Sequence, residues 1–347
     1  MTKHTWTNIV SALLFLACVA VMSFVPTPFV TWGAGTSYDL LGGPETKPMV
    51  RVTNTDTYPV TGQLRMTTVG VTPVDSRVNL VQVLMAYLTP AQDVLPRDVV
   101  YPPQLDQAAV AAQEAAQMST SQSTSIVAAL RAADVPVSEL PMVVTVTASG
   151  AAAGRLQPGD LITTVDGAVV TTPAAVQDAI EANSVGDPIA IGYLRDSVSG
   201  TETITSRASA KQADVPAIGV TIGMGYVFVP RVEFGIDPEI GGPSAGLMFA
   251  LAIYDKISPG DLAAGRIIAG TGTIDAHGGV GPIGGLQEKI AGAVRDHAEV
   301  FIMPRANCVD LTEPVGVQVI PVATLTEAVA ALGTLANPTA PPPPGCT

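Results

Sequence analysis

The chain has 347 residues, of which 47% are apolar, and a formal net charge of −13. This length allows two or three domains plus an appendage, and the apolar content suffices for a sizeable core without metals or a disulfide lattice. The negative charge and the lack of basic runs exclude nucleic acid as an expected partner, because an acidic surface repels a phosphate backbone.

An almost wholly apolar stretch at residues 9–30 predicts a transmembrane anchor, residues 1–30, in contact with membrane lipid. Its length suits one helix of roughly 20 residues. A cleaved signal peptide is the competing interpretation, but no small-x-small cleavage site follows the stretch, and Cys18 lies too deep in it for a lipoprotein site. Because Lys3 precedes the stretch and Asp39 follows it, we expect a single-pass cell-membrane protein with extracytoplasmic C-terminal domains.

The next region predicts mixed secondary structure. Residues 31–48 contain Gly, Pro and Thr and predict an extended linker. β-Branched residues then predict strands at 49–52 and 62–69, whereas 81–88 fits either a strand or a short helix. An Ala- and Gln-rich stretch from Pro102-Pro103 to about Arg131 predicts a helix, which is either continuous or broken near Ser119.

Residues 141–208 change character. Strands are expected at 143–146 and 189–195. A turn at 165–167 and a helix at 173–182 are expected between them. This order and the string Leu156-Gln157-Pro158-Gly159-Asp160-Leu161-Ile162 resemble a PDZ domain of the bacterial protease-associated type. We therefore expect a PDZ domain at 134–212, with a generic small αβ domain as the alternative.

A PDZ domain implies capture of an extended peptide, often a C-terminus, as an added strand. The resemblance places the carboxylate-binding loop just before the first strand, near Glu139-Leu140-Pro141-Met142. These residues depart from the usual glycine-containing loop. The resemblance thus implies peptide binding more firmly than recognition of a terminal carboxylate.

Ser244 lies in the string Gly241-Gly242-Pro243-Ser244-Ala245-Gly246, directly before a good helix former. Pro243 is tolerated in a first helical turn, so Ser244 is expected at a helix N-terminus, where unpaired amides and the positive dipole end converge. An oxyanion formed there would find donors. A plain N-terminal serine cap is the alternative.

Lys289 lies on a second predicted helix, which begins at Leu286. One face of this helix carries Leu286, Lys289, Ile290, Ala293, Val294 and His297, so the lysine interrupts an apolar stripe. Burial favours the neutral amine, and a neutral lysine beside a serine hydroxyl is a general base. The alternative is a lysine whose stem covers apolar surface while its head stays in water.

These two segments, with Gly270–Asp275, Gly278–Gly285 and Val300–Asn307, resemble the Ser-Lys proteolytic domain of the Lon family, peptidase family S16. The resemblance implies Ser244 as the nucleophile and Lys289 as its base. It implies that Thr271 helps to orient the lysine and that Gly242, Pro243 and Ala245 have supporting roles. Gly242 and Thr273 depart from the family pattern, which has acidic residues at both positions.

The resemblance also implies a split protease domain. Residues 213–335 are shorter than a complete Lon-type domain, so its first part is expected at 49–133, with Leu64–Val69 as edge strands and a first helix at 118–130. The expected fold is mixed, α+β and α/β, with an inserted PDZ domain and a Pro-rich tail at 336–347. The whole resembles bacterial membrane-anchored Lon-like proteases, for which a homo-oligomer is typical.

Several motifs are absent from the sequence. It has no Gly-x-x-x-x-Gly-Lys-[Ser/Thr] loop, so ATP is not an expected partner. The three histidines, at 4, 277 and 297, form no metal-binding pattern, and no cofactor is expected. A catalytic triad using His277 or His297 does not fit the family position of the base. Cys308 and Cys346 could form a disulfide in an oxidising compartment. The alternative is two free thiols, one buried and one in a frayed C-terminus.

We therefore expect an ATP-independent serine endopeptidase that cleaves extracytoplasmic unfolded or flexible polypeptides with help from its PDZ domain. The rival hypothesis is a membrane-tethered PDZ peptide-binding adaptor with an inactive protease-like domain. The departures at Gly242 and Thr273 leave room for that rival.

Overall fold

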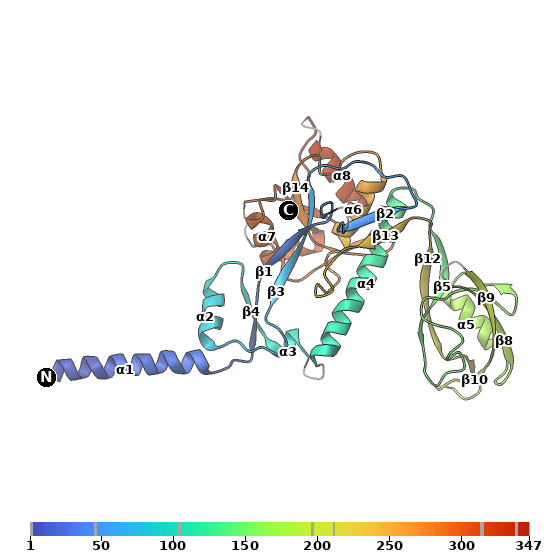
Figure 1. The fold of residues 1–347 in the computed structure, drawn as a ribbon, viewed down its shortest axis with the longest axis horizontal. Helices are drawn as coiled ribbons and strands as arrows, with labels where there is room; N and C mark the ends of the chain where they lie inside the picture. Colours follow the sequence, from blue (N-terminus) through green and yellow to red (C-terminus); the bar gives the residue numbers. More distant parts are fainter. Residues whose placement is uncertain are drawn as a thin grey trace. The chain divides into compact units, whose positions relative to one another are not determined.

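The computed structural model describes residues 3–44, 47–102, 106–195, 198–210, 212–312, 316–336 and 339–346. The chain divides into two compact units (Figure 1). Unit 1 combines residues Met1–Val135 and Pro230–Thr347, and unit 2 is Pro136–Val229. Unit 2 is thus inserted in the sequence of unit 1.

The N-terminal helix α1 spans Lys3–Phe24. Its segment Thr5–Phe24 is the one helix in the described ranges that is long and apolar enough to cross a membrane, and none of that segment is buried in the protein. The apolar stretch continues to residue 30, but the helix ends at Phe24 because Pro26 and Pro28 cannot continue it. Strand β1 (Phe29–Asp39) follows.

A six-stranded sheet with the order β18-β17-β14-β3-β1-β4 forms the centre of unit 1. The other strands are β3 (Gln63–Val71), β4 (Asp93–Pro96), β14 (Ile267–Gly270), β17 (Val300–Pro304) and β18 (Gln318–Val322). The pairs β3–β14, β14–β17 and β17–β18 are parallel, whereas β1 is antiparallel to β3 and β4. Parallel neighbours need crossover connections, and α7 (Leu286–Arg295) connects β14 to β17.

Two expectations for this region are wrong. The segment expected as a linker, 31–48, supplies most of β1, which is paired on both sides. The strand expected at the edge, Leu64–Val69, is β3 in the interior of the sheet. A Cβ atom at Gly35 would collide with the Thr68 side chain, so glycine lets β1 and β3 approach each other here. The small residues that predicted a linker therefore serve close strand pairing.

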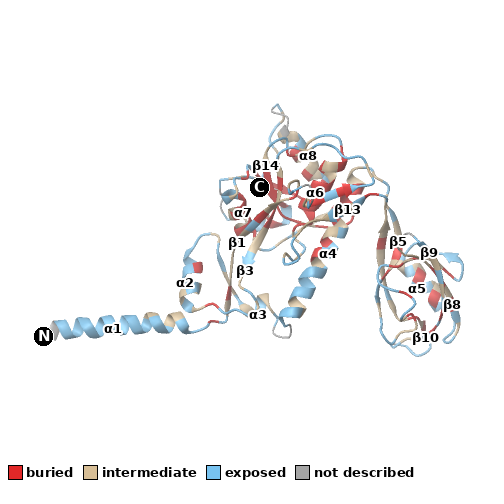
Figure 2. Cartoon of the chain, in the orientation of Figure 1, coloured by how far each residue is buried: buried red, intermediate tan, exposed pale blue. Residues whose placement is uncertain are grey.

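The longer helices of unit 1 pack around this sheet (Figure 2). They are α4 (Gln107–Ala132), α6 (Gly246–Ile257), α7 and α8 (Leu325–Ala336). Helix α7 packs with Ala269 and Phe301, whereas Met248 of α6 approaches Gly270. Successive residues of a strand point to opposite faces, so α6 and α7 cover opposite faces of the sheet. Helix α4 packs on α6 and is continuous at Ser119.

Smaller elements complete unit 1. They are β2 (Val50–Thr53), α2 (Leu80–Leu88), α3 (Arg97–Val100), β13 (Arg231–Phe234), β15 (Thr273–Ile274), β16 (Val280–Gly281) and η1 (Arg305–Asp310). The segment that fitted a strand or a helix is helix α2. A capping box fixes its start, since the Asn79 side chain accepts from the Gln82 amide and the Gln82 side chain accepts from the Asn79 amide, both at 2.9 Å.

Cys308 and Cys346 form a disulfide. Both cysteines pack against the buried cluster that contains Leu286 and Ile290 of α7. The C-terminal tail is thereby tied to the core beside α7, and neither a free buried thiol nor a frayed terminal one remains.

Unit 2 is a small sheet covered by one helix. Its strand order is β12-β5-β6-β8-β9, with β7 paired to β6. The elements are β5 (Ser138–Val146), β6 (Leu161–Val165), β7 (Ala168–Val169), α5 (Pro173–Glu181), β8 (Pro188–Arg195), β9 (Val198–Thr205), β10 (Arg207–Ala208), β11 (Pro216–Ala217) and β12 (Val220–Val227). The unit reaches Val229 and not the expected 212, because β12 pairs along the whole of β5.

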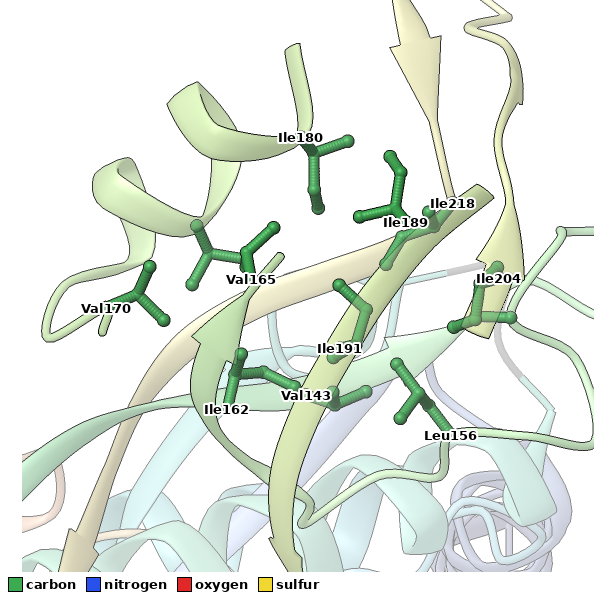
Figure 3. Packing of buried hydrophobic residues seen from close by; sticks show 12 residues of the cluster. Val143, Leu156, Ile162, Val165, Val170, Ile180, Ile189, Ile191, Ile204 and Ile218 are labelled. Carbon is green, nitrogen blue, oxygen red and sulfur yellow. The ribbon is translucent and has the colours of Figure 1, made fainter. Parts of the chain in front are cut away.

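The core of unit 2 consists of aliphatic side chains (Figure 3). Ile162, Ile189 and Ile191 are no more than 1% exposed and lie between the sheet and α5. The Asp of the Pro-Gly-Asp string, Asp160, is fully buried and receives two hydrogen bonds from the Arg195 guanidinium, at 2.6 and 2.7 Å. A buried carboxylate needs such a partner, so this pair fixes the start of β6 against β8.

Candidate active site

Ser244 lies directly before α6. Helix α6 begins at Gly246, and its N-cap residue is Ala245, which makes no side-chain capping bond. The Ser244 backbone carbonyl accepts hydrogen bonds from the Thr271 hydroxyl at 3.0 Å and from the Gly272 amide at 2.8 Å. The alternative of a plain serine cap is therefore wrong, because Ser244 precedes the capping position and is held through its carbonyl.

The loop that presents Ser244 is attached to α4. The Gly242 amide donates to the Glu114 carbonyl at 3.1 Å, and the Ser121 hydroxyl donates to the Pro243 carbonyl at 3.0 Å. Gly242 has φ +88°, a left-handed conformation that favours glycine. A glycine at this position thus suits the backbone of this loop.

Two backbone amides near the serine are available as donors. Among the described residues, the amides of Ser244 and Ala245 have no hydrogen-bond acceptor, whereas the Gly246 amide donates to the Pro243 carbonyl at 3.4 Å. Unpaired amides at a helix start carry partial positive charge. The pair forms a potential site for a negatively charged oxygen beside the serine.

Lys289 lies in the first turn of α7 and is 2% exposed. The alternative interpretation, in which the Lys289 ammonium group stays in water, is therefore wrong. Burial lowers the pKa of Lys289 to about 8, and the charge of the neighbouring Glu288 only partly opposes that effect. An amine with this pKa exchanges a proton near neutral pH, as a general base must.

Glu288 is a buried residue that the sequence reasoning missed. Glu288 lies outside the apolar face of its helix, yet it is 1% exposed, and both carboxyl oxygens lack a hydrogen-bond partner among the described residues. Burial, reinforced by the charge of Asp93 in β4, raises the pKa of Glu288. The helical pattern could not reveal this, because β1, from a distant part of the chain, packs against α7.

Ser244 and Lys289 line one cleft of about 690 Å³. It opens where β14 ends at Gly270 while β3 continues to Val71. The other lining residues are Met66, Thr67, Thr68, Val69, Val71, Pro73, Val74, Tyr101, Gln107, Val110, Ala111, Glu114, Met118, Glu239, Ile240, Gly241, Gly242 and Ala245. The helices on opposite faces of the sheet thus present serine and lysine to a common space.

The supporting residues lie around this cleft. Gly242 and Ala245 line it, whereas Pro243 lines a smaller hollow, of about 410 Å³, beside α4. Thr271 is fully buried, and its hydroxyl donates to the Ser244 carbonyl, so its observed partner is the serine and not the lysine. Sequence reasoning missed Ser121, which carries no recognisable motif in its Ser- and Thr-rich helix.

Unit 2 has its own groove, of about 760 Å³, between α5 and the edge strand β12. The loop residues Pro216–Gly219 line it and lead into β12, and Gly219 has φ +79°. The expected position of the peptide-binding loop, at 139–142, is wrong, because those residues lie in β5, which is paired with β12 and β6. The loop that lines the groove, Pro216–Gly219, instead lies near the C-terminal end of unit 2.

The comparisons with known proteins agree with both units. A family model of the Lon protease (S16) C-terminal proteolytic domain matches residues 199–330, and a PDZ domain model matches residues 119–205. The chain carries a Lon-type proteolytic domain and a PDZ domain. Unit 2 is the PDZ domain. The PDZ match also includes residues 119–132 of α4, which lie in unit 1, and it ends before β12. Unit 1 contains most of the Lon-type match.

Individual relatives match over about a quarter to a third of this chain. The archaeal Lon protease of Methanocaldococcus jannaschii is 40% identical over 91 residues, which cover 26% of this chain and 14% of that protein. The Lon protease of Roseiflexus castenholzii is 34% identical over 108 residues, which cover 31% of this chain and 13% of that one. The chain thus spans a small part of these relatives.

Among solved structures, the PDZ domain of the SdrC-like protein from Listeria monocytogenes is 30% identical and covers 24% of this chain and 85% of its own, with a TM-score of 0.22.

Proposed function

We propose that this protein is a membrane-anchored, ATP-independent serine endopeptidase that uses a Ser244–Lys289 dyad. The observation that carries the proposal is the buried position of Lys289, 2% exposed, in the cleft that Ser244 also lines. A buried lysine lowers the stability of the fold, because its ammonium is poorly solvated, and a catalytic role would explain why it is present despite that cost. The Lon-type proteolytic domain supports a protease, and the dyad supplies the chemistry.

In this mechanism the Ser244 hydroxyl oxygen attacks the carbonyl carbon of the scissile peptide while neutral Lys289 accepts the hydroxyl proton. The amides of Ser244 and Ala245 stabilise the resulting oxyanion. Lys289 then donates the proton to the leaving amine, which releases the first product and leaves an acyl-enzyme. Water, deprotonated by Lys289, hydrolyses that ester and restores the serine.

The substrate is proposed to bind as an extended strand beside β3. Strand β3 is paired with β14 only through Met66, and Thr68, Val69 and Val71 line the cleft beyond that point. An exposed strand edge offers backbone donors and acceptors to an added strand. Folded substrates cannot offer such a segment without local unfolding, so unfolded or flexible polypeptides are the proposed class.

We propose that the anchor is α1 and that the two domains are extracytoplasmic. Helix α1 has a 20-residue apolar segment, about 30 Å long at 1.5 Å per residue, which matches the hydrocarbon thickness of a bilayer. The Cys308–Cys346 disulfide supports an oxidising compartment. The chain also contains no ATP-binding loop of the Gly-x-x-x-x-Gly-Lys-[Ser/Thr] type.

The PDZ domain is proposed to bind substrate segments in the groove between α5 and β12. Strand β12 is an edge strand, and the groove is lined by Val176, Ile180 and the loop that precedes β12. An extended peptide would add to β12 and place its side chains against α5.

The proposal is tested with full-length protein in detergent, without ATP, on an unstructured polypeptide. We expect Ser244→Ala and Lys289→Ala each to lower the cleavage rate at least about 1,000-fold, as is typical when a member of a catalytic dyad is removed. A serine-reactive phosphonate should label wild type but not Ser244→Ala. Equal cleavage by both variants and wild type would refute the dyad, and no labelling together with tight peptide binding would favour the adaptor.

A further inference from the structure

Helix α2 presents a large apolar surface to solvent. Leu84, Tyr87 and Leu88 are 53%, 77% and 66% exposed, and Leu80 and Met85 are exposed as well. The side that faces the protein carries Ala86, which is 3% exposed. The helix thus turns its larger apolar residues outward, opposite to the usual arrangement in a soluble domain.

Helix α2 is fixed to the end of α1. The Thr27 amide and hydroxyl both donate to the Val78 carbonyl, at 2.9 and 2.8 Å, and Pro26 forms a β-bridge with Asn79, the N-cap residue of α2. Helix α1 ends at Phe24, only two residues before that bridge. Figure 1 shows α2 beside this end of α1 and running across its axis.

This attachment defines where α2 would lie if α1 crosses a membrane. Phe24 would then stand at the boundary of the hydrocarbon core, and the nine-residue helix, about 13 Å long, starts next to it. A helix that runs across the axis of the anchor lies along the membrane plane. The sequence between Arg77 and Asp93 contains no charged residue, so nothing in α2 opposes contact with lipid.

We infer that α2 is embedded in the membrane interface, with Leu84, Tyr87 and Leu88 in contact with lipid. This inference rests on the proposed membrane anchoring by α1. Interfacial helices bury their apolar face at the boundary between headgroups and acyl chains, and tyrosine is enriched at that level. The contact is apolar, so it requires no anionic lipid.

The contact bears on the proposed peptidase site. The segment that contains α2 also supplies Pro73, Val74 and Tyr101 to the cleft beside Ser244. The Tyr101 hydroxyl donates to the Thr72 carbonyl at 2.8 Å, which ties both ends of the segment together. The bilayer would therefore hold one wall of the cleft, and polypeptides close to the membrane surface would be favoured as substrates.

The test uses the full chain with Cys18→Ser, reconstituted in phosphatidylcholine vesicles that contain lipid with a spin label near the glycerol end of an acyl chain. Leu84→Cys and Leu88→Cys carry an environment-sensitive fluorophore, with the native disulfide kept oxidised. Val169→Cys in the PDZ domain is the matched control, because Val169 is 77% exposed and apolar. We expect at least about twofold quenching at 84 and 88 and none at 169.

Extraction of the vesicles with alkaline carbonate separates the two proposals. Protein that stays in the vesicles but shows no quenching at 84 and 88 would overturn the interfacial position of α2 and leave the anchor intact. Protein that is extracted would refute the anchor and, with it, the position of α2. Efficient cross-linking between cysteines at 84 in two chains, without quenching, would show that a second copy covers this face and would also overturn the inference.

Discussion

The Thr271 hydroxyl donates a 3.0 Å hydrogen bond to the backbone carbonyl of Ser244. This bond joins the residue after β14 to the loop that leads into α6, so the serine is positioned by the end of the central sheet. The Gly272 amide donates to the same carbonyl at 2.8 Å. Together the two donors fix the peptide bond between Ser244 and Ala245. The N–H of that peptide is the Ala245 amide, which is one of the proposed oxyanion donors.

We predict that Thr271→Val lowers kcat about fivefold with little change in KM. The substitution removes one donor to the Ser244 carbonyl but keeps the shape of the buried side chain, a loss of about 1 kcal/mol. Thr271→Ser, which keeps the hydroxyl, should retain most of the activity. Steady-state kinetics on an unstructured polypeptide provide the measurement, and an unchanged kcat for Thr271→Val would show that this bond does not position the serine.

Lys289→Met should stabilise the Lon-type domain near neutral pH. Burial lowers the pKa of Lys289 from 10.5 to about 8 in the folded state. The unfolded chain therefore binds more protons than the folded chain between pH 8 and 10.5, and wild-type stability rises with pH across that window. Below pH 8 the buried amine is protonated in the folded state, and it lowers the free energy of unfolding by the full amount, roughly 3 kcal/mol for a shift of this size.

The check is denaturant unfolding of both proteins at several pH values. The stability advantage of Lys289→Met should be greatest below pH 8 and should shrink between pH 8 and 10.5. An advantage that does not vary across this range would mean that the amine is not held in the neutral form by burial.

Glu288→Gln should shift the alkaline rise of activity to lower pH. The charge of Glu288 favours the protonated form of Lys289, so its removal lowers the pKa of the lysine further. Glu202→Gln is the control, since Glu202 pairs with Arg155 in the PDZ domain. The pH dependence of kcat/KM for both variants gives the answer, and a shift toward higher pH would contradict the electrostatic assignment.

Removal of the disulfide should destabilise the domain that carries Lys289. Cys308 and Cys346 are 38 residues apart in sequence, and a cross-link across such a loop typically contributes about 2–4 kcal/mol. The double variant with Ser at both positions should therefore have a lower Tm than the oxidised wild type. Reduction of wild type with dithiothreitol should lower its Tm by a similar amount, and no change on reduction would mean that the bridge does not form in solution.

The sequence predicted the elements whose signals are local. The strings around Ser244 and Lys289 indicated two helices, and the apolar stripe that contains Lys289 indicated burial. In the structure both residues line one cleft, and the lysine is buried. In the PDZ domain, the strand expected at 143–146, the helix expected at 173–182 and the strand expected at 189–195 correspond to β5, α5 and β8, because turns and alternating strands leave clear patterns.

The features that were missed depend on distant partners. Strand β1 is rich in Gly and Thr and becomes a strand because β3 and β4 pair with it. Glu288 has the position of a solvent-facing residue on its own helix, and only the packing of α7 against β1 buries it. The groove loop of the PDZ domain, Pro216–Gly219, was missed because the strand that follows it lies far along the chain from β5.

The most direct test of the central claim is the pH dependence of Ser244 labelling by a serine-reactive phosphonate, from pH 6 to pH 10, in wild type and in Lys289→Arg. If Lys289 is the general base, the wild-type labelling rate should rise with an apparent pKa of about 8, as the amine loses its proton, and then level off. Lys289→Arg, which stays protonated, should label slowly across the whole range. A wild-type rate that is independent of pH, or one that Lys289→Arg matches, would contradict the account.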